Sequence, residues 1–136
     1  MILKSRTDIR KWLREYRFIQ KELKSRTEYM MDFKKILIDP LPESEKTLKK
    51  TYMSIIDDMN GEIKKLRSFI QKIEKVLDKL PGAERSVIYH RYIMGIDWIT
   101  MPEYVMYEQR SCQNYEVKAL KRIAKMNIEW DGADVK

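Results

Sequence analysis

Cysteine, histidine, glycine and proline are all scarce in this chain of 136 residues, which contains one cysteine, one histidine, four glycines and four prolines. A single cysteine excludes an intrachain disulfide and suits a reducing compartment. His90 and Cys112 cannot supply a zinc site with the usual ligand spacing, and no base in the sequence points to Cys112 as a nucleophile. We therefore expect no catalytic residue, no metal and no cofactor, with Cys112 serving in packing.

Long apolar runs are missing as well. No segment approaches the roughly 18 apolar residues that a membrane span requires. The N-terminal stretch MILKSRTDIRKW lacks the apolar core of a signal peptide. These absences predict a cytoplasmic protein without a membrane partner.

The residues that are abundant favour helices. The chain is 36% charged and 43% hydrophobic, and its many Lys, Glu, Leu, Ile and Met residues with few turn-formers predict an all-α fold. The net charge is +7, and all of this excess falls in residues 1–80, which hold 20 basic and 13 acidic residues. Residues 81–136 hold eight of each and are neutral. The basic half either attracts nucleic acid without sequence preference or is simply the lysine-rich exterior of a soluble helix.

Two long helices are predicted within residues 1–80. The first apolar seam advances in alternating steps of three and four residues and is interrupted only by Arg26. Thr7 or Asp8 is expected to cap this helix, and Asp39-Pro40-Leu41-Pro42 is expected to end it. The seam consists of Ile9, Trp12, Tyr16, Ile19, Leu23, Met30, Phe33 and Leu37.

The second seam follows the same rule, with one doubled step of four beside Asn60-Gly61. The short connection containing two prolines favours an antiparallel hairpin, a coiled coil that closes either within one chain or against a second copy. Because a two-helix hairpin buries little surface on its own, we expect these helices to form a homodimerisation arm. The seam consists of Leu48, Tyr52, Ile55, Met59, Ile63, Leu66, Ile70, Ile73, Leu77 and Leu80.

Residues 81–128 are predicted to form a domain of three short helices, followed by a frayed tail over 129–136. In the first short helix the inward positions are Val87, Ile88, Tyr92 and Ile93. Gly95 is expected to end this helix in the left-handed conformation. Thr100 and Glu103 have the spacing of a capping box for the second helix, whose core side carries Trp98, Met101 and Val105.

The third short helix, within Tyr107–Ala124, has an unusual polar face. Most exposed faces of this chain consist of Lys and Glu, but here Gln109, Arg110, Gln113 and Asn114 precede the first lysine. Gln and Asn can bond bidentately to adenine edges, and Arg to guanine. These four residues are therefore candidates for reading bases in the major groove of double-stranded DNA, as in a helix-turn-helix. Candidate phosphate contacts are Ser111, Lys118, Lys121 and Lys125.

The stretch LPGAERSVIYHRYIMGIDWITMPEYVMYEQRSCQNYEVKALKRI resembles region 4 of bacterial sigma factors. It is more closely similar to the RinA/ArpU-like transcriptional regulators of Gram-positive bacteriophages, which also carry a long predicted coiled coil before this domain. The resemblance implies a helix-turn-helix that binds DNA. The matching positions are Glu84, Arg85, Val87, Ile88, Arg91, Tyr92, Ile93, Gly95, Trp98, Met101, Tyr107, Arg110, Cys112, Ala119, Leu120, Lys121 and Ile123.

Three positions depart from that family pattern near the expected turn. Pro102 replaces a small helix-former, Met106 replaces the turn glycine, and Glu108 replaces a Ser or Thr N-cap. Met106 would cost about 1 kcal/mol if its position required a positive φ, and Glu108 places a negative charge near the expected phosphates. The leading interpretation is a sequence-specific DNA-binding transcriptional regulator of phage or mobile-element type. The alternative is a module that binds RNA polymerase, a terminase or another phage or host protein.

Overall fold

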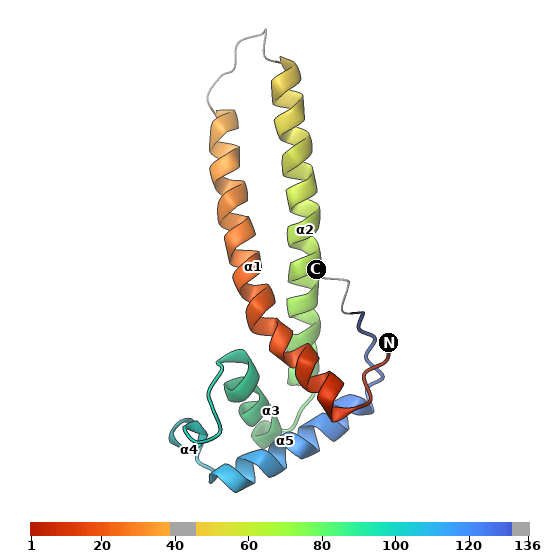
Figure 1. Cartoon of the computed structure of the whole chain (residues 1–136), viewed down its shortest axis with the longest axis vertical. Helices are drawn as coiled ribbons and strands as arrows, with labels where there is room; N and C mark the ends of the chain where they lie inside the picture. Colours follow the sequence, from red (N-terminus) through yellow and green to blue (C-terminus); the bar gives the residue numbers. More distant parts are fainter. Residues whose placement is uncertain (39–45, 132–136) are drawn as a thin grey trace.

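The structure, a computed structural model, describes residues 1–38 and 46–131, with the side chains of 1–35 and 47–131 (Figure 1). It confirms the all-α fold. Two long helices, α1 (Arg6–Ile38) and α2 (Lys46–Asp78), are followed by α3 (Gly82–Ile88), the π-helical turn η2 (Tyr89–Ile93), α4 (Met101–Tyr104) and α5 (Gln109–Ala124). The side chain of Leu37, a predicted seam residue, is not among those described, and the predicted helix stop at residues 39–42 lies outside the described part of the chain.

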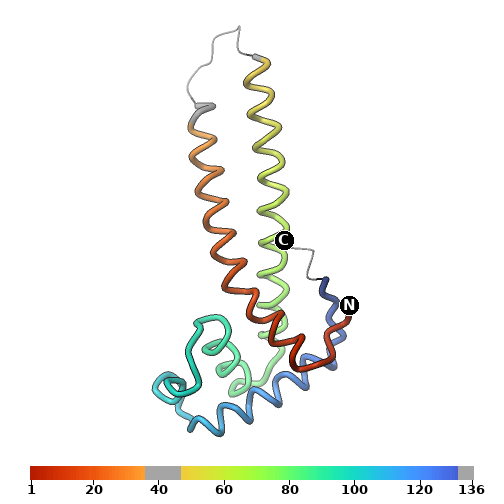
Figure 2. Tube along the Cα trace, viewed as in Figure 1, coloured from red at the N-terminus to blue at the C-terminus, as the bar shows by residue number. Residues whose placement is uncertain are grey.

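Helices α1 and α2 form the expected antiparallel hairpin within one chain (Figure 2). Phe33 and Tyr52 meet edge to face with ring centroids 5.2 Å apart. Arg26, the only break in the first seam, forms ion pairs with Glu22 on its own helix and with Glu62 on α2. Its half-exposed guanidinium therefore joins the two helices by charge at a point where apolar packing is interrupted.

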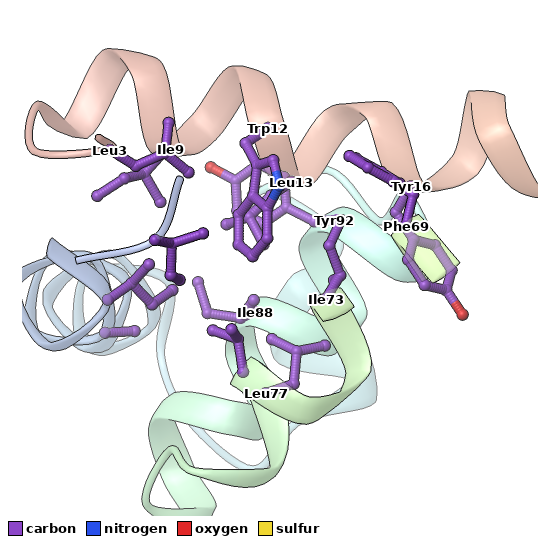
Figure 3. Close-up of a cluster of buried hydrophobic side chains, with 14 of the residues drawn as sticks. Leu3, Ile9, Trp12, Leu13, Tyr16, Phe69, Ile73, Leu77, Ile88 and Tyr92 are labelled. Atoms are coloured by element: carbon purple, nitrogen blue, oxygen red, sulfur yellow. The ribbon is translucent and has the colours of Figure 1, made fainter. Parts of the chain in front are cut away.

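One hydrophobic core extends across the hairpin and the short helices (Figure 3). Trp12 is fully buried at its centre, and its ring lies edge-on to Phe69 on α2 at a centroid distance of 6.5 Å. The seam on α2 is buried from Ile63 to Leu80, whereas Leu48 and Ile55 near the far end are exposed. The hairpin thus packs most tightly at the end that carries the short helices.

Two predicted helix caps are wrong. Helix α1 begins at Arg6, and the Ser5 hydroxyl oxygen, rather than a side chain of Thr7 or Asp8, accepts the Asp8 amide at 3.1 Å. Thr100 has helical dihedrals and makes no side-chain cap, so Thr100 and Glu103 form no capping box. Asp97 Oδ1 accepts the Thr100 amide at 2.8 Å instead, and this bond lowers the pKa of Asp97.

The end of the described chain pairs with its beginning. The Leu3 amide donates to the Ile128 carbonyl and the Trp130 amide to the Met1 carbonyl, both at 2.8 Å. Ile2 and Glu129 form an isolated antiparallel bridge. The prediction of a frayed tail from residue 129 is therefore wrong for Glu129 and Trp130, because Glu129 pairs with Ile2, its carbonyl accepts from Lys72 on α2, and the Trp130 amide bonds to Met1. Residues 132–136 lie outside the described part.

Gly95 adopts the predicted left-handed conformation, with φ of +76°. A Cβ atom built at this position would collide with the guanidinium of Arg17 on α1. The positive φ after η2 is therefore the main requirement for glycine, and the Arg17 side chain, which is exposed, would have to shift to admit a Cβ atom.

We predict that Gly95→Ala destabilises the fold by at least about 1–2 kcal/mol, because an L-residue is strained at this φ and its Cβ meets Arg17. Urea unfolding monitored by circular dichroism measures the loss. The same substitution made in an Arg17→Ala background should cost less, since only the backbone strain remains. Equal costs in both backgrounds would show that Arg17 moves aside freely.

Candidate nucleic-acid interface

The buried face of α5 anchors this helix in the core and so fixes the direction in which its exposed face points. Cys112, Ala119, Leu120 and Ile123 are all fully buried, which confirms the packing role predicted for Cys112. Cys112 packs with residues of α3 and α4 in a small second cluster formed by Val87, Met101, Val105 and Cys112. Burial raises the pKa of the Cys112 thiol, as expected for a packing residue.

A buried carboxylate ties α5 to two other elements. Glu116 is 4% exposed, and its Oε1 accepts from Arg10 Nη2 on α1 at 2.8 Å. Its other oxygen accepts the hydroxyl of Tyr92 on η2. Burial, and then the bond to Glu116, raise the pKa of Tyr92. The bond to Glu116 likewise raises the pKa of Arg10.

A second carboxylate fixes the other end of α5. Glu84 on α3 is buried, and both its oxygens accept from Arg122 Nε, at 2.9 and 3.1 Å. Sequence reasoning missed both carboxylate anchors. One signal was present, because Glu116 follows Cys112 by four residues and so falls in phase with the apolar side of α5. A charged residue at such a position requires a compensating partner.

All four candidate base-reading residues are exposed on α5. Among the described residues, none of them uses its side chain in a hydrogen bond or ion pair, so their donors and acceptors are available to a ligand. At about 100° per residue, Arg110 and Asn114 point away from the buried face of the helix. Gln109 and Gln113, one turn apart, are exposed at the start of α5 but lie in line with the buried Glu116 and Leu120, seven residues further on. The four candidates are therefore all exposed but spread across a wide arc.

The candidate phosphate contacts divide into two groups. Lys121 and Lys125 are exposed and continue the stripe begun by Arg110 and Asn114, since two turns separate Asn114 from Lys121. Lys118 is also exposed, with its ammonium 5.7 Å from the ring centre of Tyr115. Ser111 is half-buried. The lysines therefore remain suitable for a polyanion, and Ser111 is the least accessible of the four.

The three unusual turn residues fit the backbone without strain. Asn127 is the only described non-glycine residue with a positive φ, so the expected cost of about 1 kcal/mol at Met106 does not arise. Pro102 lies in the first turn of α4, where its missing donor is tolerated. Glu108 is the N-cap of α5 but makes no side-chain cap bond, which leaves its charge exposed beside Gln109.

The chain finds no match among protein-family models, curated proteins or solved structures. The likeness to RinA/ArpU-like regulators therefore remains a prediction based on the motif. Within the described residues, no group of three metal-binding side chains comes together. No described helix is long and apolar enough to cross a membrane.

We predict that Glu116→Ala destabilises the protein by about 1–3 kcal/mol, because it leaves the buried Tyr92 hydroxyl and the half-buried Arg10 guanidinium without their acceptor. Glu116→Gln should cost less, since the amide oxygen can still accept one bond. Thermal and urea unfolding measure both losses. Glu103→Ala, an exposed carboxylate on α4, is the control and should change stability by less than about 0.5 kcal/mol. A small loss for Glu116→Ala would show that the anchor is dispensable.

Proposed function

We propose that this chain is a sequence-specific, non-enzymatic DNA-binding protein, a transcriptional regulator of phage or mobile-element type. In this proposal α5 enters the major groove of double-stranded DNA. Gln109, Arg110, Gln113 and Asn114 read base edges, and Lys118, Lys121 and Lys125 contact the flanking phosphates, with Ser111 at the margin. The observation that supports it best is the exposure of all four base-reading candidates at the start of a helix that is anchored in the core.

The arrangement of the short helices also supports this function. Helix α4 lies against α5 across a short turn (Figure 1), and a helix-turn-helix presents the N-terminal part of its last helix to DNA in this way. The amides and the guanidinium lie within the first turn and a half of α5. A rigid support is required because base readout depends on placing bidentate donors and acceptors accurately.

A second candidate function has its own supporting observation. Around the turn between α4 and α5, Met106 is fully exposed, Ile99 is 81% exposed and Tyr104 is 52% exposed. These apolar side chains, with the negative charge of Glu108, suit a protein surface better than a phosphate backbone. The alternative is therefore a module that binds RNA polymerase, a terminase or another phage or host protein through this turn.

The DNA proposal predicts that Gln109→Ala with Arg110→Ala weakens binding to a site selected from a random DNA pool. The expected loss is about 1–3 kcal/mol for each bidentate contact removed, measured by gel shift. Arg67→Ala with Gln71→Ala is the matched control, because it removes the same two side-chain types from exposed positions on α2. Unchanged affinity in the first variant would exclude base reading by these residues.

Salt dependence separates the two candidate functions. Phosphate contacts make the logarithm of affinity fall steeply with the logarithm of salt concentration. A wild-type protein that shows no duplex binding at about 50 mM salt but binds purified RNA polymerase or terminase would support the interaction module instead.

We also propose that the long helices form a homodimer. Within one chain α1 and α2 already pair, so a second copy would use surface that this pairing leaves exposed. Tyr29 is 62% exposed and borders a groove with Arg26 and Glu62. Ile55 precedes Glu62 by seven residues, so it lies on the same side of α2 and is also exposed. Two hairpins meeting on this side would complete a four-helix arrangement.

The dimer proposal predicts that Tyr29→Gln with Ile55→Gln shifts the mass measured by light scattering from that of a dimer to that of a monomer. The control pair, Phe18→Gln with Met94→Gln, changes exposed apolar residues outside this groove, one on α1 and one after η2, and should leave the dimer intact. A wild-type protein of monomer mass at all accessible concentrations would contradict the proposal.

A further inference from the structure

The first half of α1 separates its charges onto different sides. Six of its basic residues follow one another in steps of four, four, three, four and three, which places them along a single face of the helix, whereas Lys11 lies on another side. From first to last they extend over roughly 27 Å at 1.5 Å per residue. This basic stripe consists of Arg6, Arg10, Arg14, Arg17, Lys21 and Lys24.

Acidic residues are absent from this face between Arg6 and Lys24, and Glu28, four residues after Lys24, is the first on it. Asp8, Glu15 and Glu22 are spaced by seven residues and so share a different side of α1. Glu22 belongs to the ion pair with Arg26, which places this acidic side towards α2. From Arg6 to Lys21, no carboxylate on the same face of α1 therefore relieves the repulsion between the cations of the stripe.

Five of the six cations are available to a ligand. Arg10 is committed to Glu116, but Arg6, Arg14, Arg17, Lys21 and Lys24 are exposed. No ion pair with a carboxylate involves these five in the part of the chain that the structure describes. The C-terminal part of the stripe borders an open groove lined by Arg17, Gln20, Lys21, Leu23 and Lys24.

The composition of this face favours phosphates over a protein surface. Gln20 is the other exposed polar residue along the stripe, Leu13 is buried, and Phe18 is a single exposed apolar neighbour. Protein interfaces need an apolar, well-packed centre, which one aromatic ring does not supply. A row of arginine and lysine side chains with a single exposed apolar neighbour is instead suited to the evenly spaced charges of a nucleic-acid backbone.

The stripe is also distinct from the outward face of α5. Arg10 meets Glu116, which lies on the inward side of α5, whereas Arg110 and Lys121 point the opposite way. A straight duplex held by α5 would therefore not cover Lys21 and Lys24. We propose that the basic stripe of α1 is a second nucleic-acid surface, which binds duplex phosphates without sequence preference. This binding does not require α5 to read bases.

The test uses the full-length chain and a random-sequence DNA duplex, with binding followed by fluorescence anisotropy over a range of salt concentrations. The stripe variant is Arg14→Gln with Lys21→Gln and Lys24→Gln; Arg17 is kept because its guanidinium lies against Gly95. We expect an affinity about 10- to 100-fold lower near 0.1 M salt. The slope of log affinity against log salt should become less steep by about 2–3, as for three lost phosphate contacts.

The matched control is Lys50→Gln with Lys64→Gln and Lys65→Gln, which removes the same charge from exposed positions on α2. It should change affinity and slope far less. Equal losses of duplex affinity in both variants would mean that only the net charge matters. Unchanged duplex affinity in the stripe variant would leave an acidic protein as the class of ligand. Either result overturns the proposal. Gln109→Ala with Gln113→Ala removes no charge and should leave the affinity for a random duplex unchanged. A failure of base reading by α5 can therefore be distinguished from a failure of phosphate binding by the stripe.

Discussion

The position of α5 depends on one buried carboxylate. Burying Glu116 without partners would be strongly unfavourable, and its two partners come from α1 and η2. Arg10 is 106 residues away in sequence and Tyr92 is 24 away, so this site can form only when the long hairpin and the short helices have come together. The charge compensation therefore selects one orientation of α5 relative to α1, which apolar packing alone would specify less sharply.

This dependence changes the role expected of the long helices. An arm that served only for dimerisation could have a core separate from that of the short helices. Here Trp12 on α1 packs among residues of both parts, and Lys4 donates to the carbonyl of Ala124 at the end of α5. The proximal half of the hairpin is thus the support on which α5 rests, while the distal half, with Leu48 and Ile55 exposed, retains free surface.

Local patterns in the sequence were sufficient to predict the elements but not their partners. Steps of three and four residues predict both long helices, because helical periodicity is a local property. The left-handed Gly95 could be predicted for the same reason. The pairing of Leu3 with Ile128 and the anchoring of Glu116 could not, because each joins segments more than 100 residues apart or depends on packing between elements. The exposure of Arg110 was predictable, whereas the ligand that it contacts depends on chemistry outside the chain.

Under the proposed function, the charge distribution has a physical consequence for how the protein would hold DNA. Residues 81–136 are neutral, whereas residues 1–80 carry the whole net charge of +7. Most of the long-range attraction to a polyanion would therefore originate in the hairpin, and base selection in α5. These two contributions respond differently to conditions, since attraction to phosphates weakens with salt and hydrogen bonds to bases discriminate between sequences. Because Arg10 belongs both to the stripe on α1 and to the anchor of α5, the two surfaces are held in a fixed relative orientation. A DNA molecule that contacts both surfaces would therefore have to bend, or a second stretch of DNA would have to bind the stripe.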